Sequence, residues 1–520
     1  GVLDEGEYCD DGNQASNDGC SSGCVVEWGW SCSGNVSACT TACGDGMVGG
    51  IEECDDGGLY NGDGCNATCR IELGWTCERE PSVCQNCGNG VVEGLEACDD
   101  GNTVSNDGCS STCVVEHSQA FKLTAENGHR LRHLGAAVSL YETTAVVGAP
   151  QSSHVSIFRR DESGKEWSFV QTVSAEGGAV SEGFGWSVSL YGSTAVIGAP
   201  YYDGTYLDMG SVYVFEGSHN NTEWQQAAQL LAPNGRWAHQ FGYAVLLYES
   251  TAVIGAVYES SSTMSGAAHV FVRSNSNSTQ WQHVTRLVPS DPVYNSLFGQ
   301  SVSIFKHTIV VGRNFDVYVF VKNGDSSQWT ESLKLTPSDG ASGAAYGHSV
   351  SIYERTAVVG APRLSTGKGS AYIFVGSSNN TQWVQTYYLE ASDGSSHDRF
   401  GYSVFIHKNT VLVGAYMIDF GSVVNAGSAY VYEGSSSNTK WREVYKLTLA
   451  GGRANDYFGQ AVAVYDNTPL IGVPRYDEMY SDTGNAYIFE LLCGNGVLDE
   501  GEYCDDGNQA SNDGCSSGCV

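Results

Sequence analysis

Hydrophobic and polar positions follow a strand-like pattern that recurs seven times between residues 119 and 492. In the clearest copy, residues 187–191 alternate apolar and polar side chains, while residues 194–200 and 210–215 are mostly apolar runs. Alternation with period two, and short apolar runs bounded by Gly and Pro, predict β-strands. A tryptophan six residues before an apolar residue marks a fourth strand. These tryptophans are Trp167, Trp224, Trp281, Trp329, Trp383 and Trp441.

Two glycine positions mark every copy of this pattern. One follows an aromatic residue or leucine, at Gly135, Gly185, Gly242, Gly299, Gly347, Gly401 and Gly459. The other opens a Gly-Ala-Pro sequence or a degraded version of it, at Gly148, Gly198, Gly255, Gly312, Gly360, Gly414 and Gly472. Multi-stranded repeats spaced 48 to 58 residues apart are typical of a propeller. We therefore predict an all-β fold with a seven-bladed β-propeller over residues 119–492.

The seventh blade lacks a fourth strand of its own. Only six of the tryptophan-marked strands are present, but Phe-Lys-Leu-Thr at residues 121–124 matches Leu-Lys-Leu-Thr at residues 333–336. We predict that residues 121–124 form the outermost strand of the seventh blade, beside residues 486–489. Closing the ring in this way removes an exposed sheet edge.

The combined positions, such as Phe184-Gly185 and Gly198-Ala199-Pro200, resemble the FG-GAP repeat of the integrin alpha-subunit propeller. The resemblance implies a seven-bladed propeller, although one fold hosts many functions. Calcium-binding blades of that family carry Asp-x-Asp-x-Asp-Gly before the hydrophobic strand. This chain has Tyr-Gly-Ser or Tyr-Glu-Thr there, so we do not expect those calcium sites in its propeller.

The nineteen cysteines all lie outside the propeller, in modules at residues 1–42, 43–86, 87–117 and 493–520. The regular spacing favours disulfides in an oxidising compartment over zinc, because repeated Cys-x-x-Cys pairs are absent and Cys84–Cys87 is the one place with that spacing. Cys32–Cys39 and Cys77–Cys84 are expected to pair, and the other four cysteines of a module have three possible connectivities. The candidates are Cys9, Cys20, Cys24, Cys32, Cys39, Cys43, Cys54, Cys65, Cys69, Cys77, Cys84, Cys87, Cys98, Cys109, Cys113, Cys493, Cys504, Cys515 and Cys519. The modules resemble cysteine-rich repeats (Cys-Gly-Asn-Gly … Cys-Asp-Asp-Gly-Asn … Asp-Gly-Cys) of secreted bacterial and protist surface proteins.

Each module concentrates carboxylates beside its cysteines. Oxygen-rich loops of Asp and Asn with Gly at the turn suit Ca²⁺, which takes six to eight oxygen ligands, although Asp-Asp-Gly-Asn is also an ordinary turn sequence. We expect Ca²⁺ in at least one module, with module 2 the weakest candidate because Gly58 replaces the Asn. The candidate ligands are Asp10, Asp11, Asn13, Asp18, Asp55, Asp56, Asp63, Asp99, Asp100, Asn102, Asp107, Asp505, Asp506, Asn508 and Asp513.

Five Asn-x-Ser/Thr sequons predict N-linked glycans, at Asn35, Asn66, Asn220, Asn277 and Asn379. The last three share one register, four residues before an outer-strand tryptophan. We expect this loop at the outer rim of the propeller, where a glycan stands in solvent.

The formal charge of −34 is unevenly placed. Residues 1–117 hold 22 acidic and two basic residues, whereas the propeller is only mildly acidic. No basic stripe exists to neutralise phosphates, so we exclude nucleic acid as a partner. No apolar run reaches the roughly 20 residues of a membrane span. His129, His133, His239 and His348 lie near the Phe-Gly turns without a catalytic motif, so we expect no enzyme.

A 25-residue identity decides the preferred function. Residues 496–520 repeat residues 1–25 letter for letter, a period of 495 residues, whereas the other modules have diverged. We predict the structural repeat unit of an extracellular glycoprotein filament, with further copies of itself as partner. In organisation this resembles flagellar hairs (mastigonemes) and surface fibrils of algae and protists. The alternative is a cell-surface adhesion or receptor ectodomain that binds protein or glycan through the propeller. A hydrolase with accessory repeats is a distant third.

Overall fold

The computed structural model describes the propeller almost completely and the cysteine modules in part. The described residues are 7–10, 20–21, 24–26, 30–34, 37–41, 43–48, 52–72, 75–78, 81–87, 89, 115–117, 121–124, 133–161, 166–178, 180–259, 264–274, 279–322, 328–340, 345–362, 367–419, 423–435, 438–449, 451–476 and 483–489. The chain forms two compact units, Gly1–Val115 and Glu116–Val520. Among the described residues, no helix is long and apolar enough to cross a membrane.

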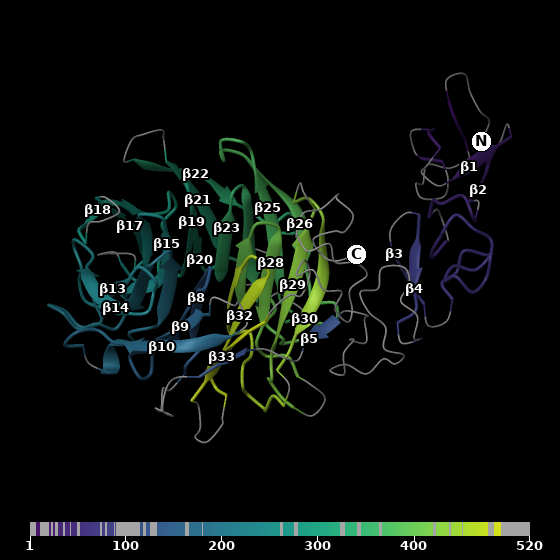
Figure 1. The fold of residues 1–520 in the computed structure, drawn as a ribbon. Helices are drawn as coiled ribbons and strands as arrows, with labels where there is room; N and C mark the ends of the chain where they lie inside the picture. The colour runs from purple at the N-terminus through teal and green to yellow at the C-terminus, as the bar shows by residue number, and fades with distance from the viewer. Residues whose placement is uncertain are drawn as a thin grey trace. The chain divides into compact units, whose positions relative to one another are not determined.

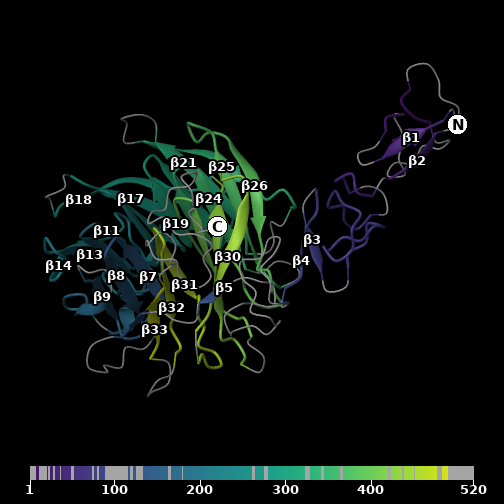
Figure 2. The same cartoon turned by 45° about the vertical axis from the view of Figure 1, so that its right-hand side comes forward.

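The second unit contains seven antiparallel sheets placed side by side around one axis (Figures 1 and 2). Blades 1 to 3 comprise β7 (Ala137–Tyr141), β8 (Thr144–Ala149), β9 (His154–Arg160) and β10 (Trp167–Val173); β11 (Ser187–Tyr191), β12 (Thr194–Ala199), β13 (Ser211–Gly217) and β14 (Trp224–Leu230); β15 (Phe241–Tyr248), β16 (Thr251–Ala256), β17 (Ala267–Arg273) and β18 (Trp281–Leu287). Blades 4 and 5 comprise β19 (Ser301–Phe305), β20 (Thr308–Arg313), β21 (Asp316–Lys322) and β22 (Trp329–Leu335); β23 (Ser349–Tyr353), β24 (Thr356–Ala361), β25 (Ser370–Gly376) and β26 (Trp383–Leu389).

Blades 6 and 7 complete the ring. They comprise β27 (Ser403–His407), β28 (Thr410–Ala415), β29 (Ser428–Gly434), β30 (Trp441–Leu447) and a fifth strand β5 (Val115–His117); then β31 (Ala461–Tyr465), β32 (Thr468–Val473), β33 (Asn485–Ile488) and β6 (Phe121–Leu123). One short 3-10 helix, η2 (Val180–Glu182), precedes blade 2. The all-β, seven-bladed fold predicted from the sequence is confirmed.

The predicted closing strand is also confirmed. β6 pairs antiparallel with β33, with Leu123 opposite Ala486 and Phe121 opposite Ile488. Leu123 is buried at 1% exposure. A parallel bridge between Leu134 and Gly484 joins blade 1 to blade 7 as well. The sheet edge of β33 is therefore covered by a strand from the start of the propeller.

The repeated glycines lie where the backbones of neighbouring blades meet. A Cβ added to Gly360 would lie 2.0 Å from the carbonyl oxygen of Gly401, and one added to Gly472 would lie 1.9 Å from that of Gly135. The glycine that follows each aromatic residue has φ between +84° and +94°, a conformation that favours glycine. Both positions of the repeat thus have a steric cause, and the contact recurs at every junction around the ring.

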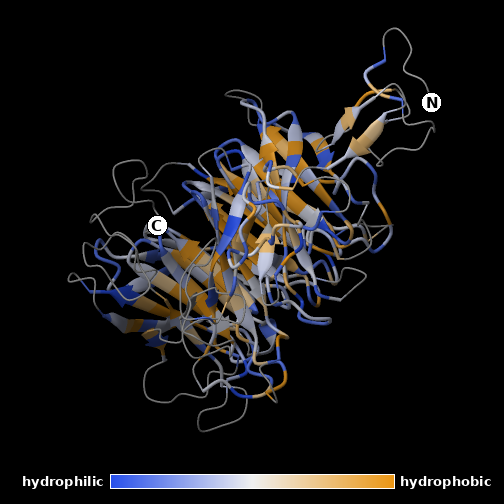
Figure 3. Ribbon diagram, turned by 90° about the vertical axis from the view of Figure 1, so that its right-hand side faces the viewer, coloured by the Kyte–Doolittle hydropathy of each residue, from blue (hydrophilic) through white to orange (hydrophobic). Residues whose placement is uncertain are grey.

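Apolar side chains of neighbouring blades pack together in shared clusters. Hydrophobic residues concentrate on the strands (Figure 3). Phe184 packs edge to face against Tyr213 and Phe215 of its own blade, with centroids 5.5 and 5.9 Å apart. Trp224 at the start of an outer strand packs in a cluster that includes Ile157 of the preceding blade. The tryptophan at the start of this outer strand therefore joins two blades.

The outer-strand loop also carries a polar link between blades. Asn221 adopts φ +56° and donates from Nδ2 to Thr144 Oγ1 of blade 1 at 3.1 Å, while its carbonyl oxygen accepts from Trp224 Nε1. Asn380 and Asn438 repeat both bonds in blades 5 and 6. This asparagine lies three residues before the tryptophan, a spacing that the sequence analysis did not use.

Each described module of the first unit has a small disulfide framework. Short hairpins β1 (Ser31–Ser33)–β2 (Ala38–Thr40) and β3 (Thr76–Glu78)–β4 (Val83–Gln85) hold the predicted Cys32–Cys39 and Cys77–Cys84 bonds, which are confirmed. The connectivity that the sequence left open is now defined. In module 2, the first of the four shared cysteines bonds to the fourth, and the second bonds to the third. The remaining bonds are Cys43–Cys69, Cys54–Cys65 and Cys9–Cys20.

Cys24 corrects one expected disulfide. It is a free thiol whose Sγ lies 3.2 Å from Glu7 Oε1. Its counterpart in module 2, Cys69, pairs with the opening cysteine Cys43, and module 1 has no such cysteine in this sequence. Cys87 is disulfide-bonded. The predictions for Cys98, Cys109, Cys113, Cys493, Cys504, Cys515 and Cys519 lie outside the described residues.

Candidate functional site

The inner strands line a central channel, and an aromatic side chain ends each of them. These side chains are Tyr141, Tyr191, Tyr248, Phe305, Tyr353, His407 and Tyr465. Neighbouring ring centroids lie 4.7–5.4 Å apart all the way round, including the closing contact between Tyr465 and Tyr141. We call this closed ring of side chains the aromatic belt. Pairs of this kind contribute about 0.5–1.5 kcal/mol each beyond the area they bury.

The orientation of the rings explains how the aromatic belt closes. Six of the seven neighbouring pairs have planes inclined by 45–65°, and His407–Tyr465 by 27°. One blade is turned from the next by about 51° in a seven-fold ring, so the planes follow the blades. Burial lowers the pKa of His407 to about 4, so its imidazole is neutral and takes part as an aromatic ring. The aromatic belt bounds a cavity of about 410 Å³.

The opposite end of the channel holds a larger cavity of about 730 Å³. Each blade contributes the residue that follows its aromatic-Gly pair. These residues are Ala136, Trp186, Tyr243, Gln300, His348, Tyr402 and Gln460, and His133, Pro150, Gln151, Ser181, Gly183 and Tyr201 complete the lining. We call it the Phe-Gly-side cavity. This cavity was not among the features predicted from the sequence, although a comparison of the residue after glycine across the seven repeats would have found its ring.

The candidate histidines do not form one site. His133 and His348 line the Phe-Gly-side cavity, whereas His239 is buried in blade 3, and His129 lies outside the described residues. In blade 3, His269 Nε2 lies 2.6 Å from Glu259 Oε2.

The carboxylate of Glu259 is balanced by cations. Arg286 Nε donates to Glu259 Oε1 at 2.5 Å. Burial opposes ionisation, but hydrogen bonding and charge from His269, with those from Arg286, outweigh it and lower the pKa of Glu259 to about 2. His239 Nδ1 lies 3.9 Å from Glu259 Oε2 and accepts from the amide of Arg236, and burial lowers the pKa of His239, so this histidine joins the core cluster as a neutral ring.

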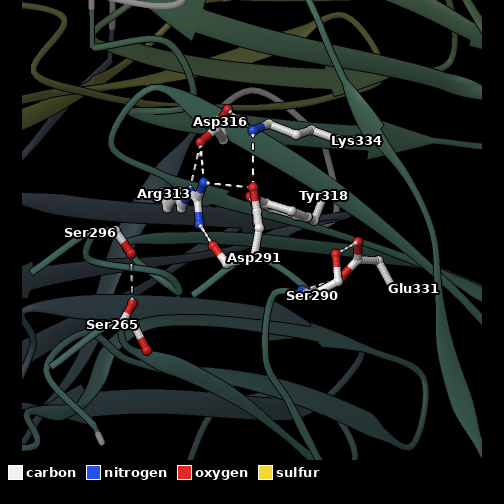
Figure 4. A network of polar contacts seen from close by, with 9 residues as sticks. All are labelled: Ser265, Ser290, Asp291, Ser296, Arg313, Asp316, Tyr318, Glu331 and Lys334. Carbon is white, nitrogen blue, oxygen red and sulfur yellow. Dashed lines mark hydrogen bonds and ion pairs between the residues drawn. The ribbon is translucent and has the colours of Figure 1, made fainter. Parts of the chain in front are cut away.

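Blade 4 carries a second buried ionic network, in place of the Gly-Ala-Pro sequence (Figure 4). Arg313, 3% exposed, donates to Asp316 Oδ2 at 2.7 Å and to the carbonyl oxygen of Asp291 at 2.8 Å. Tyr318 donates to Asp291 Oδ1, and Lys334 pairs with Asp316. The buried guanidinium is therefore paired on both sides, which explains how a charged residue replaces alanine in this repeat.

Two acids elsewhere in the propeller make its stability depend on pH. Burial raises the pKa of Glu443 to about 7 and that of Asp398 to about 6. Because the folded state holds these protons more tightly than the unfolded state, their stabilisation is complete below the unfolded pKa values near 4 and is lost as pH rises through 6 and 7. Glu259 acts oppositely, since its contribution is lost below about pH 4.

Glu443→Gln should lower the thermal midpoint at pH 5 relative to that at pH 7.5, compared with the parent, because the amide cannot take up the proton that stabilises the fold below pH 7. The histidines whose pKa burial lowers, His239, His283 and His407, act in the opposite direction, but they do so in the parent and in the variant alike. Glu331→Gln is the matched control, since Glu331 accepts the same two bonds from Ser290 that Glu443 accepts from Ser392. Melting curves of both variants at the two pH values test the assignment. An unchanged pH difference in Glu443→Gln would contradict it.

In module 2, the carboxylate of Asp55 is fully buried and binds backbone amides. Its oxygens accept from the amides of Gly44, Asp45, Gly46 and Gly57 at 2.7–3.2 Å. Burial alone would raise the pKa of Asp55, but these four donors hold it below its usual range. Asp55 therefore organises two loops of the module.

The remaining candidate calcium ligands are placed only in part. Cys43, Asp55 and Cys69 lie close enough to form a cluster, but the two sulfurs share a disulfide and are not thiolate ligands. Asp56 accepts from the amide of Gly58 at 2.8 Å, and Asp63 is exposed. Asp10 donates its amide to Ser37 Oγ, as Asp55 does to Ser82 Oγ. Outside the described residues lie Asp11, Asn13, Asp18, Asp99, Asp100, Asn102, Asp107, Asp505, Asp506, Asn508 and Asp513.

Calcium binding by the modules stays a prediction. Variants of module 2 can distinguish calcium binding from the structural role of Asp55. Asp55→Ala should destabilise module 2 by about 2–3 kcal/mol, equally in calcium and in EGTA, because it leaves amide donors unpaired. If Ca²⁺ binds there, EGTA should speed amide hydrogen exchange of residues 43–86 in the parent chain, and Asp56→Asn should lose that response. If the rate of amide hydrogen exchange is the same with and without EGTA, these loops are ordinary turns that bind no calcium.

The described sequons place asparagine side chains at exposed turns of the propeller. Asn220 and Asn379 are exposed, and each Oδ1 accepts from the hydroxyl of the sequon threonine, Thr222 or Thr381, at 2.7 Å. Asn66 makes the same contact with Thr68 in module 2. Asn35 and Asn277 lie outside the described residues. Since the asparagine after Asn220 links two blades, the shared register also reflects the structure of the loop.

Comparison with known families agrees with these features. The FG-GAP repeat family matches residues 167–215, 224–271, 281–327, 329–374, 383–432 and 441–489. A domain of unknown function (DUF4215) matches residues 27–70, 72–114 and 479–520, which overlap the cysteine-rich modules. The comparison with curated proteins finds no match. FG-GAP repeats and several disulfides are typical of extracellular proteins, and this propeller is typically non-catalytic. With six repeats over more than half of its length, the chain belongs to the FG-GAP repeat family.

Proposed function

We propose that this chain is the structural repeat unit of an extracellular glycoprotein filament, without catalytic activity. The observation that carries the proposal is the identity of residues 496–520 with residues 1–25. Modules 2 and 3 have diverged from module 1, so identity over this length is best explained by a sequence that recurs with a period of 495 residues. Copies would follow one another as propellers separated by cysteine-rich modules, and N-linked glycans would coat the propeller rims.

Two structural features support this proposal. β5 pairs with β30 of blade 6 and β6 pairs with β33 of blade 7, so the chain enters the propeller beside the blade from which it leaves. Disulfides cross-link the described modules over short spans, which stiffens segments too small to hold a core. When two different surfaces of a protein bind each other and the contacts do not close into a ring, the copies assemble into a filament.

The experiment is electron microscopy of native material together with two periods expressed in tandem. We expect filaments with one propeller per repeat and, for the tandem protein, two propellers joined by modules. A native protein that is monodisperse and carries a single propeller would exclude the filament.

An adhesion or receptor ectodomain is the second candidate, favoured by the Phe-Gly-side cavity. A filament needs no cavity of about 730 Å³ ringed by one side chain from each blade. Cell-binding assays with the chain immobilised on beads test this candidate.

A further inference from the structure

The Phe-Gly-side cavity has the size and position of a ligand site. Its volume of about 730 Å³ lies within the range of roughly 300–1,000 Å³ that small-molecule sites occupy. Every blade contributes one residue to its ring, at the start of an inner strand. A site built on the ends of strands is held more rigidly than one built on loops.

The lining carries no formal charge. Among the described residues that line the cavity, none is Asp, Glu, Lys or Arg, although the chain as a whole has a net charge of −34. A nucleotide, an acidic peptide or a polyamine would find no opposite charge here to compensate its desolvation. The lining therefore favours a neutral ligand.

Aromatic rings flank the cavity in two groups. Trp186 contacts Tyr201 and Tyr243, with centroids 5.4 and 5.6 Å apart. In later blades, Tyr402 contacts His348 at 4.5 Å and Tyr416 at 4.4 Å. These aromatic lining residues are only partly buried, so each ring is held by its neighbours and keeps some exposed surface. Such rings offer flat apolar surface without charge.

Polar groups of the lining are available for hydrogen bonds. The side-chain amide of Gln460 and the indole N–H of Trp186 have no hydrogen-bond partner within the described part of the chain. Gln300 Nε2 donates to the carbonyl oxygen of Gly347 at 3.1 Å, which orients the rest of its amide. Amides both donate and accept, which matches hydroxyl groups that also do both.

We propose that the Phe-Gly-side cavity binds a neutral carbohydrate. Sugar rings present apolar C–H faces that pack on aromatic rings, and hydroxyl groups at their edges that pair with amides and imidazoles. The carbohydrate has two sources, the N-linked glycans of other copies of this chain or the glycans of a different surface. The exposed sequons at Asn220 and Asn379 are the predicted attachment sites of the first source. The assignment does not depend on the filament, since a lone propeller has the whole cavity.

The test uses the full 520-residue chain on an array of neutral oligosaccharides, with sialylated and sulfated counterparts beside them. N-glycans released from the chain itself form a second set of probes. We expect at least one neutral glycan to bind, more tightly than its charged counterparts. Binding of the released glycans alone identifies other copies of the chain as the source, and binding of unrelated glycans alone identifies an external surface.

Variants locate the binding in the cavity. Trp186→Ala and Gln460→Ala should each weaken the binding of the tightest-binding neutral glycan at least about tenfold. Trp237→Ala is the matched control, because Trp237 is 66% exposed and lies outside the cavity, and it should bind as the parent does. Melting curves show whether each variant is folded. If Trp186→Ala does not fold, Gln460→Ala still tests the site.

Three results would overturn the assignment: no glycan from either set binds, only charged glycans bind, or folded Gln460→Ala binds as tightly as the parent. None of these bears on the filament, which imaging tests separately.

Discussion

Gly360→Ala is expected to lower the free energy of unfolding of the propeller by about 3 kcal/mol, near the upper end for overpacked sites. The new methyl carbon would lie 2.0 Å from the carbonyl oxygen of Gly401 and 2.3 Å from Ser349 Oγ. The serine hydroxyl rotates away, but the carbonyl belongs to the backbone of the next blade. Relief therefore requires two blades to separate along their whole contact.

Gly235→Ala is the matched control for this substitution. Its nearest atom, the carbonyl oxygen of Ala232, would lie 3.4 Å from the new Cβ, an ordinary contact, and its φ is also outside the left-handed region. Alanine at such a position is neutral or stabilises by about 0.4–1 kcal/mol through the unfolded chain. Denaturant titrations followed by tryptophan fluorescence compare the two. Equal stability of both variants would mean that the blades move apart at little cost.

Leu123→Asp is expected to destabilise the propeller by about 3–5 kcal/mol, because it places an unpaired charge in a closed sheet. Leu123 is 1% exposed and packs in a cluster with Leu140 of blade 1 and Ile488 of blade 7. Losing β6 also exposes the edge of β33, and an unpaired edge recruits other strands. The variant should therefore form concentration-dependent oligomers that the parent does not form.

Lys122→Ala separates loss of the strand from loss of a side chain. Lys122 lies in the same strand, partly exposed, with its Nζ 4.9 Å from the centre of the Tyr476 ring. Removing that contact should cost about 0.5–1 kcal/mol without oligomers. Melting curves and light scattering over a range of concentrations measure both effects. A monomeric, stable Leu123→Asp protein would show that β6 is dispensable for closure.

The architecture followed from local pattern because its causes are local. Strand periodicity, the glycine positions and the tryptophan spacing each reflect the backbone or packing needs of one repeat, and seven copies made the period plain. The missing seventh tryptophan at one end and Phe121–Leu123 at the other identified the closing strand. The pairs Cys32–Cys39 and Cys77–Cys84 followed from the sequence because modules 1 and 2 carry them in addition to the cysteines that they share with module 3.

Other features depend on contacts that no local pattern contains. Disulfide connectivity within the four-cysteine sets was undecided until the loops were placed, because all three arrangements fit the spacing. In the sequence, Asp55 and Asp56 are two adjacent carboxylates with nothing to distinguish them. In the structure, Asp55 is buried and accepts from the amides of Gly44 and Gly46, whereas Asp56 accepts from the amide of Gly58.

The channel shows the same division between repeat and ring. Residues such as Trp186 and Tyr402 are variable positions within their repeats, lying more than two hundred positions apart in the sequence, and Tyr141 and Tyr465 are farther apart still. The sequence shows the chemical character of each of these side chains. Only closure of the ring brings one side chain per blade to the same end of the channel, because the inner strands run side by side around one axis. A cavity is a property of that closed arrangement, so it could not be read from the strands that build it.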